Sequence, residues 1–283
     1  MQYLLLAIPF IGALTHAVDL IVSKLVLTKE HAGYEDFCFY FFMLVFLLMF
    51  PFFQFFGGIP NQAFTATYLF CGLAVIVLAF VYNLVFYHGI KKEDMSEVEN
   101  LYMFQGLFVL FFAFIIFSDE RSLTTLIPAI IASFALIFSH VKKYHLKVSR
   151  MQIIFLLGVL MMAVEAIFLK KLLEIFNPYI LYMTRCGILA VAFFIYKRPD
   201  VKKATSHFLL HMFTIAFTAA AALVLYYWTI KEQGVVYTNL IYTLSPIFVL
   251  VYSYIGFKEK IYWKKIIASV IILICIVVVE ILR

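Results

Sequence analysis

Charged residues are scarce in this sequence. Asp, Glu, Lys and Arg together make up 13% of its 283 residues, whereas 65% are hydrophobic. A soluble domain carries about 25% charged residues and about 45–50% apolar ones. A water-soluble fold of this length could not cover so much apolar side chain with so little polar surface. The composition therefore excludes that class and indicates a membrane protein.

The sequence also lacks the common catalytic and metal-binding motifs. The four cysteines lie singly inside apolar runs and never at CxxC spacing, which argues against a disulfide framework or a zinc site. The sequence contains no Walker A, GxSxG or HExxH motif. We therefore expect neither an enzyme nor a bound metal or cofactor. Any energy for work is expected to come from gradients, because no segment suits an ATP-hydrolysing domain.

Long apolar runs dominate what is present. Several exceed about 18 residues with few charges, which is the length a helix needs to cross about 30 Å of hydrocarbon. The runs are continuous, unlike the short alternating segments of a membrane β-barrel. The sequence thus predicts an all-α membrane protein with ten transmembrane helices. The expected spans are 2–27, 34–56, 62–88, 95–117, 123–141, 151–174, 178–196, 206–230, 235–256 and 261–282.

The basic residues lie mainly in the short loops after odd-numbered spans. The formal net charge is +6, which in a soluble protein would suggest a nucleic-acid partner. Lys and Arg between membrane spans instead indicate topology, because cytoplasmic loops carry the excess of positive charge. We therefore expect no nucleic-acid partner and a multi-pass protein of the plasma membrane with both termini on the non-cytoplasmic side.

The two halves of the sequence resemble each other. The pattern G-x4-A-x-[DE]-x4-K occurs at residues 12–24 and again at 158–170, an offset of 146. A second similarity, at an offset of 140, relates residues 86–117 to 226–257. Five spans in each half place the halves in opposite orientations, as in many secondary transporters. We predict two inverted five-helix repeats, 1–145 and 146–283, within one membrane domain.

The ten spans, this repeated pattern and the acidic residues after spans four and nine, Glu120 and Glu259, resemble the EamA-like branch of the drug/metabolite transporter superfamily. Pro246 is similar to the proline of that family's ninth helix, while Gln105 and Gly106 stand in span four where a proline often occurs. The resemblance implies a secondary transporter in the lipid bilayer, working as a monomer or homodimer.

Carboxylates within the spans are the first candidates for function. Asp19 and Glu165 occupy equivalent positions in spans one and six, and a charge in lipid is costly unless it faces a cavity or a partner. We predict that both line a central cavity and bind a cationic group or a proton. Pairing with a nearby lysine, or capping of a helix end, is the structural alternative. His16 shares a helix face with Asp19 and either bonds to it or packs.

Polar and aromatic pairs extend the candidate site into spans four and nine. Glu99 and Tyr102 correspond to Asn239 and Tyr242 at the offset of 140. Two such pairs related by the repeat would face each other across a cavity. We therefore predict that all four contact substrate.

Three further candidates, Asn83, Tyr87 and Tyr227, lie in spans three and eight. The alternative for the tyrosines is a place in the aromatic belt at the membrane surface. Arg185 in span seven is expected either to meet a substrate carboxylate or to neutralise Glu165. Lys170 is expected to extend to the membrane surface or to cap a helix end.

Together these residues predict a secondary active transporter that moves a small metabolite by alternating access. Acids among tyrosines favour an amine, a quaternary ammonium compound or an amino acid as substrate, with protons as the candidate coupling ion. Two other classes stay open. One is a membrane-embedded carrier or enzyme acting on a lipid headgroup, and the other is a non-transporting assembly subunit whose intramembrane charges bind a partner.

Overall fold

The computed structural model describes residues 2–29, 33–92, 104–140, 150–199, 206–245, 247–248, 251 and 263–282. Within these ranges the chain forms α-helices and short 3-10 helices, and none of these residues lies in a β-strand. Six of the described helices are long and apolar enough to cross a membrane, and three shorter apolar helices accompany them. The all-α prediction is confirmed, whereas a membrane crossing by all ten predicted spans stays a prediction.

The helices follow the predicted spans. The first half contains α1 (Gln2–Lys29), α2 (Tyr34–Met49), α3 (Ala66–Lys92), α5 (Phe104–Ile116) and α6 (Leu123–His140), with the 3-10 helices η1 (Phe50–Phe55), η2 (Asn61–Phe64) and η3 (Ser118–Glu120) between them. The second half contains α7 (Arg150–Leu173), α8 (Pro178–Tyr196), α9 (Ser206–Gln233), α10 (Val235–Tyr242) and α12 (Trp263–Leu282). Residues 95–103 of span four and 246, 249–250 and 252–256 of span nine lie outside the described residues, and so does Glu259.

Proline sets the boundaries of two helices. α2 ends at Met49 and not at residue 56, because Pro51 has no N–H to donate and clashes with the preceding turn, so the chain continues as η1. Proline at the start of a helix is favourable instead, since the first N–H has no partner there. Pro178 accordingly begins α8, and the Asn177 side chain caps it by accepting the Tyr179 N–H at 2.9 Å.

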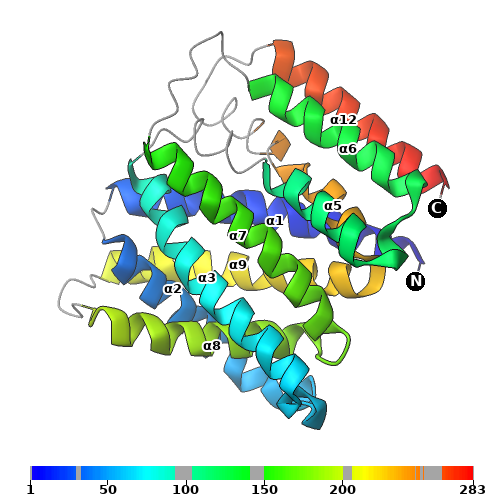
Figure 1. Ribbon diagram of the computed structural model, residues 1–283. Coiled ribbons are helices and arrows are strands. Elements are labelled where there is room, and N and C mark those ends of the chain that lie inside the picture. The colour runs from blue at the N-terminus through cyan, green and yellow to red at the C-terminus, as the bar shows by residue number, and fades with distance from the viewer. Residues whose placement is uncertain are drawn as a thin grey trace.

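The strongest helix contacts join the two halves of the sequence. α1 packs along α9, α3 along α7, α2 along α8, and α6 along α12. Figure 1 shows α6 and α12 side by side at one edge of the bundle, with α8 at the opposite edge. Glycines let α3 and α7 approach closely: a Cβ at Gly158 would lie 3.1 Å from Val85 Cγ1, and one at Gly89 would lie 2.6 Å from Phe155 Cδ2.

The outward faces of the helices carry large apolar side chains. On α12, Ile266, Val270, Ile274 and Val277 are all exposed and recur at three- or four-residue spacing, while Ile272 between them is buried. A continuous apolar stripe on the outside of a protein suits lipid tails and not water. The described helices therefore present the surface that the composition predicts for a multi-pass membrane protein.

Both chain ends lie at the same end of the bundle (Figure 1), as an even number of spans requires. The side of the membrane that this end faces stays a prediction.

One apolar core joins chiefly α1, α2 and α3 to α7, α8 and α9, and a second joins α5, α6, α10 and α12. Polar side chains gather where these two cores meet.

Candidate functional site

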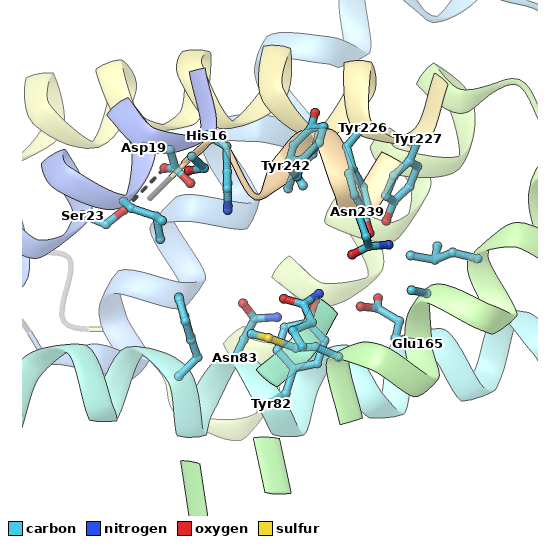
Figure 2. A pocket seen from close by; sticks show the side chains of 18 of the residues that line it. His16, Asp19, Ser23, Tyr82, Asn83, Glu165, Tyr226, Tyr227, Asn239 and Tyr242 are labelled. Atoms are coloured by element: carbon cyan, nitrogen blue, oxygen red, sulfur yellow. Dashed lines mark hydrogen bonds between the residues drawn. The ribbon is translucent and has the colours of Figure 1, made fainter. Parts of the chain in front are cut away.

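A cavity of about 180 Å³ lies where α1, α3, α5, α7, α9 and α10 converge, and each of these helices contributes polar side chains to its wall. Figure 2 shows His16 and Asp19 on one side of the central space, and Glu165, Tyr227 and Asn239 on the other. Ligand sites in proteins typically measure about 300–1,000 Å³ for drug-sized molecules. This cavity fits a smaller solute.

Eight of the ten residues predicted to bind substrate line this cavity. They are His16, Asp19, Asn83, Tyr87, Glu165, Tyr227, Asn239 and Tyr242. The other two, Glu99 and Tyr102, lie outside the described residues. Binding of substrate by any of the ten stays a prediction. The structure does bring together side chains from five helices of both halves of the sequence, α1, α3, α7, α9 and α10.

Asp19 is a buried carboxylate that has no cationic partner among the described residues. Its side chain is 7% exposed, on the face of α1 that borders the cavity. The Ser23 hydroxyl one turn further along donates to Asp19 Oδ1 at 3.4 Å, which is long for a hydroxyl hydrogen bond. Among the residues that the structure describes, no Lys or Arg forms an ion pair with it. A buried charge in this state needs a compensating ligand or a proton.

Glu165, the repeat equivalent of Asp19, is compensated. Arg185 of α8 donates through Nε to Glu165 Oε1 at 2.9 Å, and both side chains are 5% exposed. A second guanidinium nitrogen of Arg185 donates to the Tyr82 hydroxyl at 2.5 Å. Of the two roles expected for Arg185, the structure supports neutralisation of Glu165. The two equivalent carboxylates therefore differ: one belongs to an internal ion pair and the other does not.

The two asparagines of the wall make the same local contact. Asn83 Nδ2 donates to the Ala79 carbonyl at 2.7 Å, and Asn239 Nδ2 donates to the Val235 carbonyl at 2.8 Å, each four residues back in its own helix. Each amide thus directs a donor into its helix backbone. The carbonyl oxygen of each side chain accepts no hydrogen bond from the described residues.

Hydroxyl groups supply the remaining polar surface. The Tyr242 hydroxyl donates to the Ala222 carbonyl at 3.0 Å, and its ring packs edge-on against Tyr226 with centroids 4.8 Å apart. The hydroxyls of Tyr227 and Ser245 are buried and have no hydrogen-bond partner among the described residues. Buried polar atoms in proteins are nearly always paired, so an unpaired atom beside a cavity indicates a place for a ligand or water.

Several polar residues of the wall were not predicted. They are Ser23, Tyr82, Gln105, Thr243 and Ser245. Ser23 follows Asp19 by four residues, and Ser245 follows Tyr242 by three, so each lies one helical turn from a predicted residue. A search for polar side chains at that spacing inside apolar spans would have found both.

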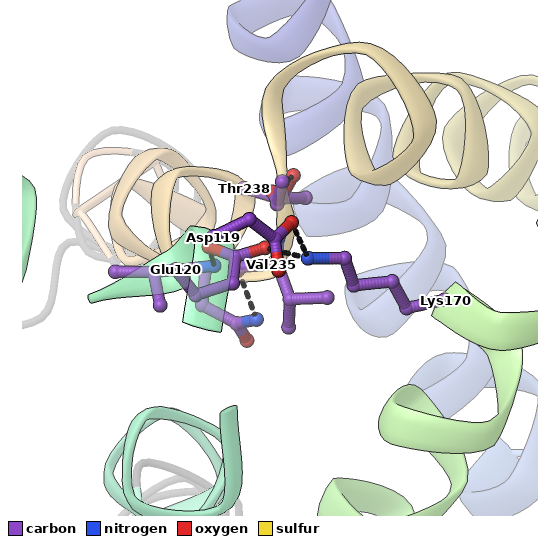
Figure 3. A network of polar contacts seen from close by, with 8 residues as sticks. Asp119, Glu120, Lys170, Val235 and Thr238 are labelled. Carbon is purple, nitrogen blue, oxygen red and sulfur yellow. Dashed lines mark hydrogen bonds and ion pairs between the residues drawn. The ribbon is translucent and has the colours of Figure 1, made fainter. Parts of the chain in front are cut away.

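A second polar cluster joins the halves away from the cavity (Figure 3). Lys170 at the end of α7 pairs with Asp119 at 2.6 Å and Glu120 at 2.7 Å, both in η3. The Glu120 carboxylate also accepts the N–H groups of Val235, at 2.6 Å, and Val236, at 3.2 Å, at the start of α10. Glu120 thus caps α10, where unpaired N–H groups and the helix dipole favour an anion.

Gly234 makes this cap possible. Its φ of +90° is a conformation that residues with a side chain rarely adopt, and a Cβ there would lie 2.6 Å from Glu120 Oε1. At the edge of the cluster, the hydrogen bond from Lys170 lowers the pKa of the Asp119 carboxyl. Lys170 therefore joins an ion-pair network at a helix end, close to the capping role expected for it.

Within the described parts of the chain, no three His, Cys, Asp or Glu side chains are grouped closely enough to hold a metal ion. The cavity wall contains the charged residues Asp19, Glu165 and Arg185, together with His16. Among the described residues, the wall thus presents one carboxylate without a cationic partner and several oxygen atoms without a hydrogen bond.

A bundle of helices with apolar outward faces around a small polar cavity is the architecture of a multi-pass membrane protein. The model of the EamA-like transporter family matches residues 149–281. Over this part of the sequence the chain is similar to EamA-like transporters of small molecules, which agrees with the predicted resemblance to the drug/metabolite transporter superfamily. No curated protein sequence matches the chain.

The fold also occurs among solved structures. One crystal structure, described only as that of a protein, superposes on 96% of this chain and 99% of its own with a TM-score of 0.73 and 11% sequence identity. At so low an identity the similarity shows a common fold and carries no information on substrate.

Proposed function

We propose that this protein is a secondary transporter that moves a small, singly charged cation by alternating access, with Asp19 as its counter-ion in the cavity. The observation that carries the proposal is the state of Asp19: buried, beside the cavity and without a cationic partner among the described residues. Leaving a bare carboxylate inside a membrane protein costs several kcal/mol, so such residues mark substrate or ion pathways.

The charge balance of the cavity supports a single positive charge on the ligand. The wall contains two acids, Asp19 and Glu165, and one permanent base, Arg185. Arg185 and Glu165 neutralise each other at 2.9 Å, which leaves one negative charge when His16 is neutral. One monovalent cation, or one proton in its absence, restores neutrality. An anionic ligand would instead have to displace Glu165 from Arg185.

The packing of the helices supports the inverted repeat on which alternating access depends. A two-fold relation that exchanges spans one to five with six to ten turns the α1–α9 pair into the α7–α3 pair. It also maps the α2–α8 and α6–α12 pairs onto themselves. These four pairs have the strongest contacts in the described structure. The family match over 149–281 coincides with the predicted second repeat, 146–283, as expected if half of the chain is one family unit.

In this proposal the two halves rock around the cavity and expose it to one side at a time. Asp19 from the first half and Glu165 from the second border the same space, so movement of the halves would change the surroundings of a bound cation. The ion pair of Glu165 with Arg185 stays within the second half, which keeps its charge neutral during the movement.

Uptake by purified protein in liposomes tests the proposal. The panel contains radiolabelled small amines, quaternary ammonium compounds, amino acids and neutral sugars. We expect at least one cationic solute to enter faster than into empty liposomes, and Asp19→Asn to abolish this uptake. Glu174→Gln is the matched control, because Glu174 is a half-exposed carboxylate paired with Lys171 outside the cavity.

Uptake of neutral sugars alone, or cation uptake unaffected by Asp19→Asn, would contradict the proposal. Flipping of a labelled lipid, with no uptake of soluble compounds, would instead favour a carrier of lipid headgroups. Isolation of the protein only as an obligate complex with another membrane protein, without any transport, would favour an assembly subunit.

A further inference from the structure

We infer that the cation bound at Asp19 is a protonated amine recognised through its N–H groups, and not a quaternary ammonium ion. The inference rests on the proposed function and narrows its substrate class. It follows from the oxygen acceptors of the cavity wall, which receive either one long hydrogen bond or none from the described residues.

Acceptors remain available on both sides of the cavity. The Asp19 carboxylate has two oxygens and receives one long hydrogen bond, from Ser23 at 3.4 Å. Across the space, the side-chain carbonyls of Asn83 and Asn239 accept no hydrogen bond from the described residues. A primary ammonium group has three N–H donors and matches this set of oxygens.

Several donor groups of the wall already make hydrogen bonds within the protein. Arg185 donates to Glu165 at 2.9 Å and to Tyr82 at 2.5 Å. The Tyr242 hydroxyl donates to the Ala222 carbonyl. The amide nitrogens of the two asparagines donate to their own helices. The buried hydroxyls of Tyr227 and Ser245 lack partners among the described residues, and a hydroxyl can accept as well as donate.

A quaternary ammonium ion would leave these acceptors without donors. Its recognition depends on the open faces of several aromatic rings around the methyl groups. The rings at this cavity pack against each other instead: Phe86 on Tyr87 with centroids 5.4 Å apart, and Tyr226 on Tyr242 at 4.8 Å.

Ethanolamine and choline form the matched pair of ligands that tests this inference. They share the same alcohol and the same single charge at pH 7, and differ in three methyl groups on nitrogen. N-methyl- and N,N-dimethylethanolamine complete the series. Each ligand is titrated onto the purified full-length protein in detergent, and the dissociation constant is obtained from the ligand-induced rise in unfolding temperature.

We expect the affinity to fall along the series as N–H groups are lost, with choline at least about tenfold weaker than ethanolamine, because a hydrogen bond to a charged group contributes about that factor. Asp19→Asn should abolish binding of every member. Asn83→Leu should weaken ethanolamine while leaving choline unchanged, and Glu174→Gln should change neither.

Choline binding as tight as ethanolamine, still dependent on Asp19, would overturn the inference and leave the cation site of the proposed function standing. Binding of ethanolamine that survives Asp19→Asn would overturn both. Absence of binding by the whole series to the wild type would also overturn the inference, and uptake of another cation in the liposome panel would then decide the proposed function separately. The ligand comparison in the wild type needs no variant to fold.

Discussion

Removal of Arg185 should destabilise this protein far more than removal of an exposed basic residue in a pair of similar length. In Arg185→Met the guanidinium disappears while Glu165 stays 5% exposed at the cavity wall, and Tyr82 loses its hydrogen bond. Breaking a buried ion pair by removing one partner costs about 3–5 kcal/mol, because the remaining charge is neither paired nor hydrated. We expect a loss of that size for Arg185→Met.

The matched control is Lys171→Met, since Lys171 pairs with Glu174 at 2.7 Å while their side chains are 42% and 45% exposed. An exposed pair contributes about 0–1 kcal/mol, so this variant should unfold almost as the wild type does. The double variant Arg185→Met with Glu165→Met has no unpaired charge and should recover most of the loss. Reversible unfolding by SDS in mixed micelles measures all four proteins. Equal stability of Arg185→Met and Lys171→Met, or no recovery in the double variant, would refute this account of the pair.

The cluster that caps α10 gives three more predictions, each measured by the same unfolding assay. Gly234→Ala should lower the free energy of unfolding by about 1–3 kcal/mol, because alanine is strained at a φ of +90° and its Cβ displaces Glu120. The control Gly58→Ala should change the free energy of unfolding little, since no atom lies within 4 Å of a Cβ at that position. Glu120→Gln should lower the free energy of unfolding by about 1–3 kcal/mol, because the charge-assisted hydrogen bonds to Lys170 and to the start of α10 are lost. A smaller loss of stability than in Asp119→Asn would contradict the capping role of Glu120. The pKa of Asp119 is lowered by Lys170, so its stabilising effect is present above the ordinary value of about 3.9 and is lost as the pH falls through the lowered pKa. The small stability difference between wild type and Asp119→Asn should therefore vanish in acid, and a difference that persists there would contradict the ionic origin.

Helix positions could be predicted from the sequence because long apolar runs leave few alternatives in a membrane. The bounds of α8 were predicted to the residue, since Asn177 and Pro178 supply the cap and the first turn. The predicted span 34–56 agrees with the candidate span Tyr34–Phe55. Within it the regular α-helix ends at Met49 and the chain continues as η1, because Pro51 has no N–H to donate.

Most of the candidate site could be predicted because a polar side chain inside an apolar span is costly in lipid and therefore faces a cavity or another helix. Asp19, Glu165 and Asn83 met this criterion, and all three line the cavity. The difference between the two acids depends on where Arg185 points, which is a property of helix packing and not of spacing along the chain. For the same reason the sequence left the role of Arg185 open between a substrate carboxylate and Glu165.

Contacts between residues that are far apart in the sequence could not be predicted. Glu120 was recognised as an acidic residue at a repeated position, yet its contact with α10 lies more than a hundred residues further along the chain. The cap also depends on Gly234, whose positive φ has no signal beyond the glycine itself. Such contacts follow from the packing of the halves, which the repeat suggests only in outline.

Counterflow in proteoliposomes is the measurement that tests the central claim most directly. Liposomes loaded with unlabelled ethanolamine are diluted into a trace of the labelled compound, without any ion gradient. A carrier that exposes one site alternately to each side predicts transient accumulation of label above equilibrium, and Asp19→Asn should abolish it while Glu174→Gln retains it. Label that only equilibrates in the wild type, or accumulates equally in Asp19→Asn, would contradict alternating access around Asp19.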